Sequence, residues 1–172
     1  EFLNTYTDKE KDILGKYSSS LFTLNTFYTA NKTIVGRTIK KDTEKFLLDY
    51  WNNVVEHMAQ WQELQHREIT KVDLRESYIA TQSIVIQALG RIGNYYVSHQ
   101  SEMKDGLQEL ERINWSRSAK QWYMRAVGKN GRIITSKKAA LLISNVIKKE
   151  LGIALSAEEL NAEEALKKTI KD

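Results

Sequence analysis

Apolar residues recur at steps of three and four over most of this chain. Such spacing places apolar side chains on one face of an α-helix, and it predicts a helix that packs against a core. The clearest stripe follows Asp42, and polar residues such as Lys45, Asp49 and Glu56 fall on its other side. We therefore expect a helix over residues 43–65. Its apolar stripe consists of Phe46, Leu47, Tyr50, Trp51, Val54, Val55, Met58, Trp61 and Leu64.

A second long helix is predicted over residues 71–98, where the same apolar spacing continues. It begins after Thr70, whose hydroxyl can accept a hydrogen bond from the backbone of Asp73 while the Asp73 carboxylate accepts one from Thr70. Gly90 and Gly93 lie inside this helix. Because glycine weakens a helix, we expect another group to approach closely there, and a crossing helix is favoured over a bound phosphate.

Caps and glycines mark the ends of shorter helices. The capping pattern recurs at Thr7 with Glu10 and at Ser156 with Glu159. Glycines stand where helices would end, at Gly15, Gly36 and Gly152. We expect these further helices over residues 8–15, 20–35, 102–111, 117–126, 136–151 and 157–169. The one competing strand, Arg132–Thr135, is too short to form a sheet of its own.

Composition supports a helical fold. The chain has 172 residues and no proline, whereas average usage would give roughly nine. Proline interrupts helices, so its absence favours long helices over a turn-rich sandwich. The sequence therefore predicts an all-α, multi-helix domain with two long amphipathic helices and several shorter ones. We expect residues 1–172 to form a single domain, and a piece of a longer polypeptide because the sequence opens with Glu1 and not Met.

Charge is distributed unevenly along the chain. Residues 112–149 contain ten Lys or Arg and no Asp or Glu, which leaves 16 of the 26 basic residues against all 22 acidic ones elsewhere. Such a basic run is typical of a surface that binds a phosphate-rich partner. Trp115, Trp122 and Tyr123 are interleaved with the charges and could contact nucleic acid. A solvated basic face with these aromatic rings turned into the core explains the same pattern.

Three predicted segments of this run would contact DNA. The helix over residues 136–151 places its lysines and Asn145 opposite its apolar side, where they can reach phosphates and an adenine. Its first residue, Ser136, is equally suited to cap the helix. The loop Gly128–Arg132 offers amides and two cations to a phosphate. The helix over residues 117–126 is separated from the next by about nine residues, too many for a helix-turn-helix. The expected DNA-binding residues are Arg117, Lys120, Arg125, Lys129, Arg132, Lys137, Lys138, Asn145, Lys148 and Lys149.

Patterns for catalysis and metal binding are absent from the sequence. There is no Cys, which excludes disulfides and thiolate sites. The histidines, His57, His66 and His99, do not form the pair with an intervening Glu that a zinc hydrolase helix requires. We interpret the four acids of the last helix as a solvated face, at Glu158, Glu159, Glu163 and Glu164. We therefore expect no enzyme activity, no metal and no cofactor. No stretch approaches the roughly 18 apolar residues of a membrane span, so no membrane partner is expected.

Five segments, in this order and at similar spacing, resemble a known family. They are Ser20–Leu24, Leu74–Ile79, Ala88–Asn94, Ile113–Arg117 and Asn145–Gly152. Together they resemble the C-terminal half of the DNA sulfur-modification (phosphorothioation) protein family DndB, the DGQHR-motif family, over nearly the whole chain. The motif that names the family belongs to its N-terminal half, and Gln65-His66-Arg67 is not that motif because Glu63-Leu64 precede it. Two departures lie in the basic run: the family more often has Asp where Asn114 stands, and an extra residue and a Gly near Trp122–Arg125.

The resemblance implies a cytoplasmic bacterial protein that binds double-stranded DNA and regulates transcription of the gene cluster that places sulfur on the DNA backbone. It identifies no functional residue in this half of the family. One alternative is a protein-interaction or dimerisation domain, which would associate with itself or with other DNA-modification proteins. Another is an enzyme fragment whose catalytic groups lie in the missing half.

Overall fold

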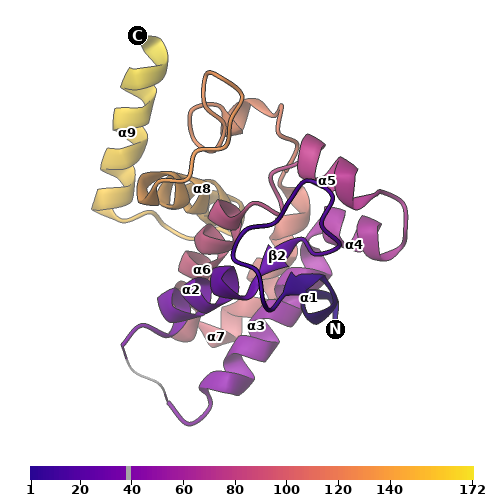
Figure 1. The fold of residues 1–172 in the computed structure, drawn as a ribbon. Coiled ribbons are helices and arrows are strands. Elements are labelled where there is room, and N and C mark those ends of the chain that lie inside the picture. Colours follow the sequence, from indigo (N-terminus) through magenta and orange to yellow (C-terminus); the bar gives the residue numbers. More distant parts are fainter. Residues whose placement is uncertain (38–39) are drawn as a thin grey trace.

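A computed structural model describes residues 1–37 and 40–172 of the chain, and it is mainly helical (Figure 1). The predicted all-α class is confirmed, since the only sheet in the described residues is a pair of two-residue strands. The elements are α1 (Phe2–Tyr6), β1 (Thr7–Asp8), β2 (Phe22–Thr23), α2 (Leu24–Val35), α3 (Thr43–His57), α4 (Ala59–Gln65), α5 (Lys71–Ser77), α6 (Ser83–Val97), α7 (Gln100–Gln108), the 3₁₀ turns η1 (Glu109–Arg112) and η2 (Lys120–Trp122), α8 (Lys137–Glu150) and α9 (Ala157–Lys171).

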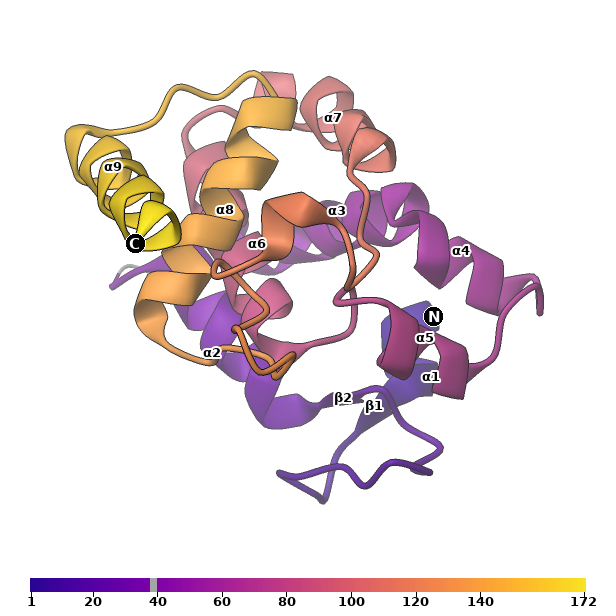
Figure 2. The same cartoon turned by 90° about the horizontal axis from the view of Figure 1, so that it is seen from above.

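Helix α6 lies at the centre of the fold, with α2 packed against it on one side and α8 on another (Figures 1 and 2). Its apolar residues are buried nearly all round: Ile84, Val85, Ile86, Ala88, Leu89, Ile92 and Tyr96. Its polar residues Gln87, Arg91 and Asn94 share one narrow stripe, and a helix with so wide an apolar face packs against neighbours on several sides. Within the described residues, no helix is long and apolar enough to cross a membrane.

The two glycines of α6 allow α2 to approach closely. A Cβ atom at Gly90 would lie 3.0 Å from the backbone oxygen of Ala30, and one at Gly93 would lie 2.7 Å from Cγ1 of Ile34. A larger residue would therefore push the two helices apart. The predicted crossing helix is confirmed, and it is α2.

Both long helices predicted from the apolar spacing are interrupted. The helix expected over residues 43–65 breaks at Met58, whose backbone is extended (φ −87°, ψ 98°). The side chain of Gln62 donates to the carbonyl oxygen of Val55 at 2.7 Å and so satisfies a group that the break releases. The bend leaves Trp61 fully buried, so the apolar spacing continues across it.

The helix expected over residues 71–98 stops after Ser77 and resumes at Ser83. A segment distant in sequence takes the backbone groups between them: Ile79 N donates to Trp115 O at 2.9 Å, and Arg117 N donates to Ser77 O at 2.8 Å. Periodicity cannot reveal such a pairing because it reports only local spacing.

The N-terminal helix expected over residues 8–15 is absent. Instead, β1 pairs in parallel with β2, with Thr7 opposite Phe22. The Asp8 carboxylate accepts hydrogen bonds from the backbone of Glu10 and Lys11, each at 2.9 Å, and so forms a turn where the sequence suggested a capped helix. The helix expected from residue 20 begins at Leu24.

The helix expected over residues 117–126 is only the short turn η2 within an irregular segment. Trp115 and Trp122 anchor this segment in the core, stacked with ring centroids 5.4 Å apart and almost fully buried. The indole of Trp122 donates to Asn114 O at 2.7 Å. The interpretation that these two rings face the core is therefore correct, whereas Tyr123 remains 44% exposed. The candidate strand Arg132–Thr135 supplies only an isolated bridge, from Ile133 to Val127.

Most of the predicted helix ends are confirmed. Reciprocal capping hydrogen bonds join Thr70 to Asp73 and Ser156 to Glu159. Ser136 caps α8, since its hydroxyl accepts from Ala139 N at 3.1 Å. Two of the three glycines expected at helix ends, Gly36 and Gly152, have the positive φ angles that suit this position, at 68° and 73°.

Candidate nucleic-acid interface

The basic run occupies the irregular segment around η2 and then the whole of α8. Helix α8 lies between α6 and α9, so two of its sides are covered (Figure 2). Its cations therefore differ in exposure according to the direction in which they point. The ten predicted binding residues separate into an exposed group, a group paired with α9, and Arg117.

Four exposed cations gather at the start of α8 and in the loop before it. This group, termed the basic cluster below, consists of Lys129, Arg132, Lys137 and Lys138. Within the part of the chain that the structure describes, none of them has a carboxylate partner within 4.0 Å. Lys120 and Lys149 are also exposed, the first in η2 and the second near the other end of α8.

A tight turn shapes the loop that carries Lys129 and Arg132. Gly128 N donates to Arg132 O at 2.9 Å, and Arg132 N donates to the side chain of Asn130 at 3.0 Å. Gly131 has a φ of +74°, which a residue with a side chain rarely adopts. The loop, tan in Figure 1, projects from the top of the molecule and places its two cations in solvent.

Lys137 and Lys138 occupy the first turn of α8, which contains no acidic residue. The N-terminus of a helix carries a partial positive charge, so cations there weaken the helix and anions strengthen it. These two lysines are therefore unfavourable for α8 itself. The same site attracts phosphate, because the dipole and both ammonium groups act on it together.

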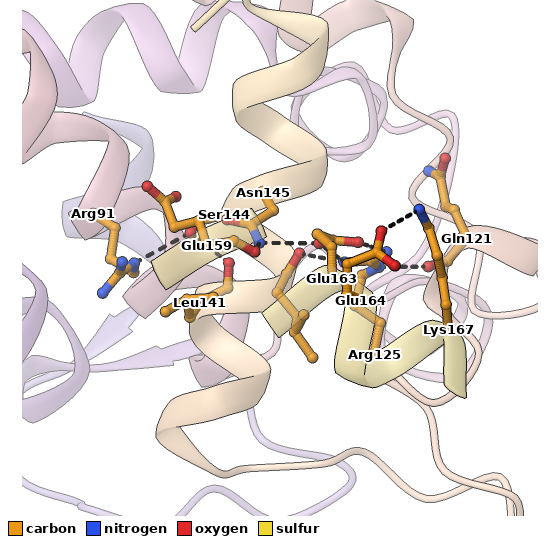
Figure 3. A network of polar contacts seen from close by, with 11 residues as sticks. Arg91, Gln121, Arg125, Leu141, Ser144, Asn145, Glu159, Glu163, Glu164 and Lys167 are labelled. Carbon is orange, nitrogen blue, oxygen red and sulfur yellow. Dashed lines mark hydrogen bonds and ion pairs between the residues drawn. The ribbon is translucent and has the colours of Figure 1, made fainter. Parts of the chain in front are cut away.

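Two of the predicted DNA-binding cations are instead engaged by α9. Arg125 forms a two-pronged ion pair with Glu163, with Nη2 2.8 Å from Oε2, and the two side chains are only 12% and 7% exposed (Figure 3). Lys148 Nζ lies 2.9 Å from Glu159 Oε1, with exposures of 13% and 5%. The interpretation of the α9 acids as a solvated face is therefore wrong for Glu159 and Glu163.

The expected exposure of Asn145 is also wrong. Its side chain is fully buried, and Nδ2 donates to Glu163 Oε1 at 3.0 Å and to Glu159 O at 3.3 Å (Figure 3). Asn145 therefore cannot reach a base in this structure. The sequence reasoning considered one covered side of α8 and missed the second. The signal was the pair of acids one turn apart on the capped helix α9, opposite a helix rich in lysine.

Ion pairing keeps both glutamates ionised. Burial alone would raise the pKa of Glu163, but hydrogen bonds from Arg125 and Asn145, with the charge of Arg125, outweigh it and leave that pKa below its ordinary value. Burial likewise opposes ionisation of Glu159, and hydrogen bonds from Lys148 and Ser156 lower its pKa overall. The α8–α9 contact is therefore one between charged groups at neutral pH.

Arg117 is half-buried against α5. Its Nη2 donates to the carbonyl oxygen of Arg75 at 3.4 Å, while its buried Nε has no hydrogen-bond partner among the described residues. This arrangement places the guanidinium against the protein backbone. Arg117 is thus less able to reach a phosphate than the exposed cations of the basic cluster.

The histidines and acidic residues do not form a metal site among the described residues. Among residues 1–37 and 40–172, no group of three or more His, Asp or Glu side chains is arranged to hold a metal ion. His57 Nδ1 lies 2.7 Å from Glu111 Oε1, and His99 stacks on the ring of Tyr95.

Comparison with known proteins identifies the family. No curated protein and no solved structure matches the chain. The model of the DndB family, described as DNA-sulfur modification-associated, matches residues 1–154 of 172. The match covers the fold from α1 through α8 and ends before α9 begins at Ala157. The chain therefore belongs to the DndB family of DNA-sulfur modification-associated proteins.

Proposed function

We propose that this chain is a DNA-binding helical domain of a transcriptional regulator, which acts on the gene cluster for DNA phosphorothioate modification. One observation carries the proposal: four exposed cations in the first turn of α8 and the loop before it, in a run that contains no acid, have no carboxylate partner among the described residues. Phosphate contacts provide most of the affinity of such a surface for DNA, and they depend little on sequence. The family description, DNA-sulfur modification-associated, agrees with a DNA partner.

The location of the cluster supports double-stranded DNA as the partner. The loop with Lys129 and Arg132 and the first turn of α8 are consecutive in sequence, and both present cations to solvent. A helix N-terminus flanked by cations suits the DNA backbone, where phosphates repeat at a fixed spacing. No cofactor and no catalytic step is required by this function.

The test is a gel-shift assay with a duplex from the promoter of the protein's own gene cluster. The natural chain should shift this duplex at low salt, and heparin should compete. A variant with all four cluster cations replaced by Ala should lose at least about tenfold in affinity, since several phosphate contacts are removed together. Lys41→Ala, an exposed lysine outside the run, is the control and should bind like the natural chain.

The alternative is a protein-interaction or dimerisation domain, with DNA binding or catalysis elsewhere in a longer protein. The observation in its favour is an apolar groove of about 700 Å³ between α1, α2 and α3, lined in part by Leu47, Leu48 and Trp51. A mass measurement in solution separates the two functions. A dimer that does not shift DNA at low salt would favour the alternative, and a monomer that shifts DNA would favour the DNA-binding domain.

A further inference from the structure

Helix α9 covers α8 with acids at the places where DNA phosphates would bind cations. The Glu163 carboxylate pairs with the guanidinium of Arg125 and accepts a hydrogen bond from Asn145 (Figure 3). The Glu159 carboxylate pairs with the ammonium of Lys148, and its backbone carbonyl accepts a second hydrogen bond from Asn145. A guanidinium, an ammonium and a carboxamide are groups that proteins use to contact the DNA backbone. The two carboxylates, four positions apart on α9, thus act toward α8 as a row of anions.

We propose that α9 is a displaceable acidic cover, which occupies a second phosphate-binding surface on α8 and the segment before it, and competes with DNA for this surface. This inference rests on the proposed DNA-binding function. The covered surface consists of Arg125, Asn145 and Lys148. The exposed basic cluster makes the first contact with DNA, and release of α9 extends the surface along α8.

The register of α8 places the covered Asn145 in line with two exposed lysines. Lys138, Asn145 and Lys149 follow one another at steps of seven and four, so they lie on one stripe of the helix. The ten steps along the helix from Lys138 to Lys148 span about 15 Å, which corresponds to about four base pairs along the DNA axis. At present α9 interrupts this stripe at Asn145, which is fully buried.

Charge, more than apolar contact, attaches α9 to the domain. Of its fifteen residues three are buried, and two of these are the glutamates; the third is Leu166. Leu160 and Ile170 of the same helix are 52% and 47% exposed. Because apolar burial is small, the ion pairs supply much of the attraction, and another polyanion can take their place.

Two buried polar atoms in the contact between α8 and α9 lack hydrogen-bond partners. The side-chain oxygen Oδ1 of Asn145 and Oε2 of Glu159 are buried and have no hydrogen-bond partner among the described residues. Unpaired buried polar atoms destabilise the closed arrangement and therefore favour its opening. Helix α9 stands at the edge of the molecule (yellow in Figure 1), joined to α8 by residues 151–156, and begins after residue 154, where the match to the family model ends.

The decisive experiment compares two double variants of α9. Glu159→Gln with Glu163→Gln removes the two buried charges, and Glu158→Gln with Glu164→Gln removes two exposed charges from the same helix. Both change the net charge equally, so non-specific attraction to DNA rises equally. Affinity for one labelled duplex is measured by fluorescence anisotropy, and circular dichroism confirms that each variant is folded.

We expect the buried-charge variant to bind DNA at least about fivefold more tightly than the exposed-charge variant, which lies within the usual range for coupling between two sites. Equal affinities of the two folded variants would overturn the proposal, and so would weaker binding by the buried-charge variant.

A second measurement uses the natural chain, so it does not depend on how the variants fold. Hydrogen exchange in α9 should accelerate when the duplex is added, because DNA releases the helix, and unchanged or slower exchange would overturn the proposal. A different experiment tests the proposed DNA-binding function, so its failure can be distinguished from failure of the α9 proposal. If alanine at the four cluster positions leaves affinity unchanged, the basic cluster is not the DNA surface, whereas α9 is judged only by the ratio of the two double variants and by hydrogen exchange.

Discussion

At the scale of single residues, the packing of α2 on α6 depends on the missing side chains of two glycines. Gly90→Leu should lower the free energy of unfolding by about 1–3 kcal/mol through overpacking, because the nearest atom to a new Cβ is a backbone oxygen, 3.0 Å away, that cannot rotate aside. Urea unfolding measures the change. Gly15→Ala is the control, since nothing lies within 4 Å of its Cβ. A Gly90→Leu protein as stable as the natural one would contradict this packing.

Arg125 and Lys129 belong to the same basic run but should respond differently to substitution. Arg125→Ala removes one partner of a buried ion pair and should lower stability by about 3–5 kcal/mol, because it leaves Glu163 charged and unpaired. Lys129→Ala removes an exposed side chain and should change stability by less than about 0.5 kcal/mol.

Thermal and urea unfolding of the two variants give the comparison. If Arg125→Ala is as stable as Lys129→Ala, the ion pair with Glu163 contributes little. Any loss of DNA affinity in Arg125→Ala must be measured well below its melting temperature, since part of that loss would reflect a disturbed fold.

At the scale of elements, the sequence predicts where most helices lie but not where the long ones break. The capping boxes at Thr70 and Ser156 mark helix starts correctly because the pattern is local. The gap between α5 and α6 depends on hydrogen bonds to Trp115 and Arg117, roughly forty residues away in sequence, which no local pattern contains. The burial of Asn145 cannot be predicted from the basic run either, because α9, which buries it, lies outside the run.

The first turn of α8 should show opposite effects on stability and binding. Lys138→Ala removes a cation from the positive end of the helix and should leave stability unchanged or raise it, by up to about 1 kcal/mol. The same change should weaken binding to every DNA sequence about equally, because a phosphate contact is lost. Thermal unfolding and anisotropy with two unrelated duplexes provide the two readouts. Loss of both stability and affinity would assign Lys138 a structural role instead.

Helix α9 should become less firmly attached in acid. The pKa values of Glu159 and Glu163 in the folded chain lie below their ordinary value of 4.5. A carboxyl with a depressed folded pKa stabilises the fold above its unfolded pKa, and this contribution is lost as the pH falls through the folded value. The attachment of α9 is therefore complete at neutral pH and weakens below about pH 4.5.

Melting temperatures between pH 7 and pH 3 test this expectation. The variant with Glu159→Gln and Glu163→Gln should lose less stability over that range than the natural chain, because it lacks the two groups that take up protons. The variant with Glu158→Gln and Glu164→Gln provides the comparison for exposed acids. Identical pH profiles of the buried-charge variant and the natural chain would show that the ion pairs to α8 do not depend on pH.

At the scale of the whole molecule, the basic run defines one polarised surface, but its length overstates how many cations are free. The sequence identifies the segment that carries positive charge, since composition alone reveals an acid-free run of ten cations. It cannot reveal that Arg125 and Lys148 already have carboxylate partners, because those partners lie beyond the run. The basic cluster of four, together with the exposed Lys120 and Lys149, is what the predicted set presents to solvent.

The number of free cations that contact phosphates determines how strongly DNA affinity depends on salt concentration. Each phosphate neutralised by a cation contributes about −0.9 to the slope of log affinity against log salt concentration. Four contacts from the basic cluster should give a slope of about −3 to −4, and Arg132→Ala should flatten it by about one. Anisotropy titrations from low to moderate salt provide the slope, with Lys41→Ala as the control. The exposed Lys120 and Lys149 could steepen the slope to about −5. A slope steeper than about −6 would therefore mean that Arg125 and Lys148 also contact phosphates, as release of α9 requires. Equal effects of Arg132→Ala and Lys41→Ala would remove the basic cluster from the interface.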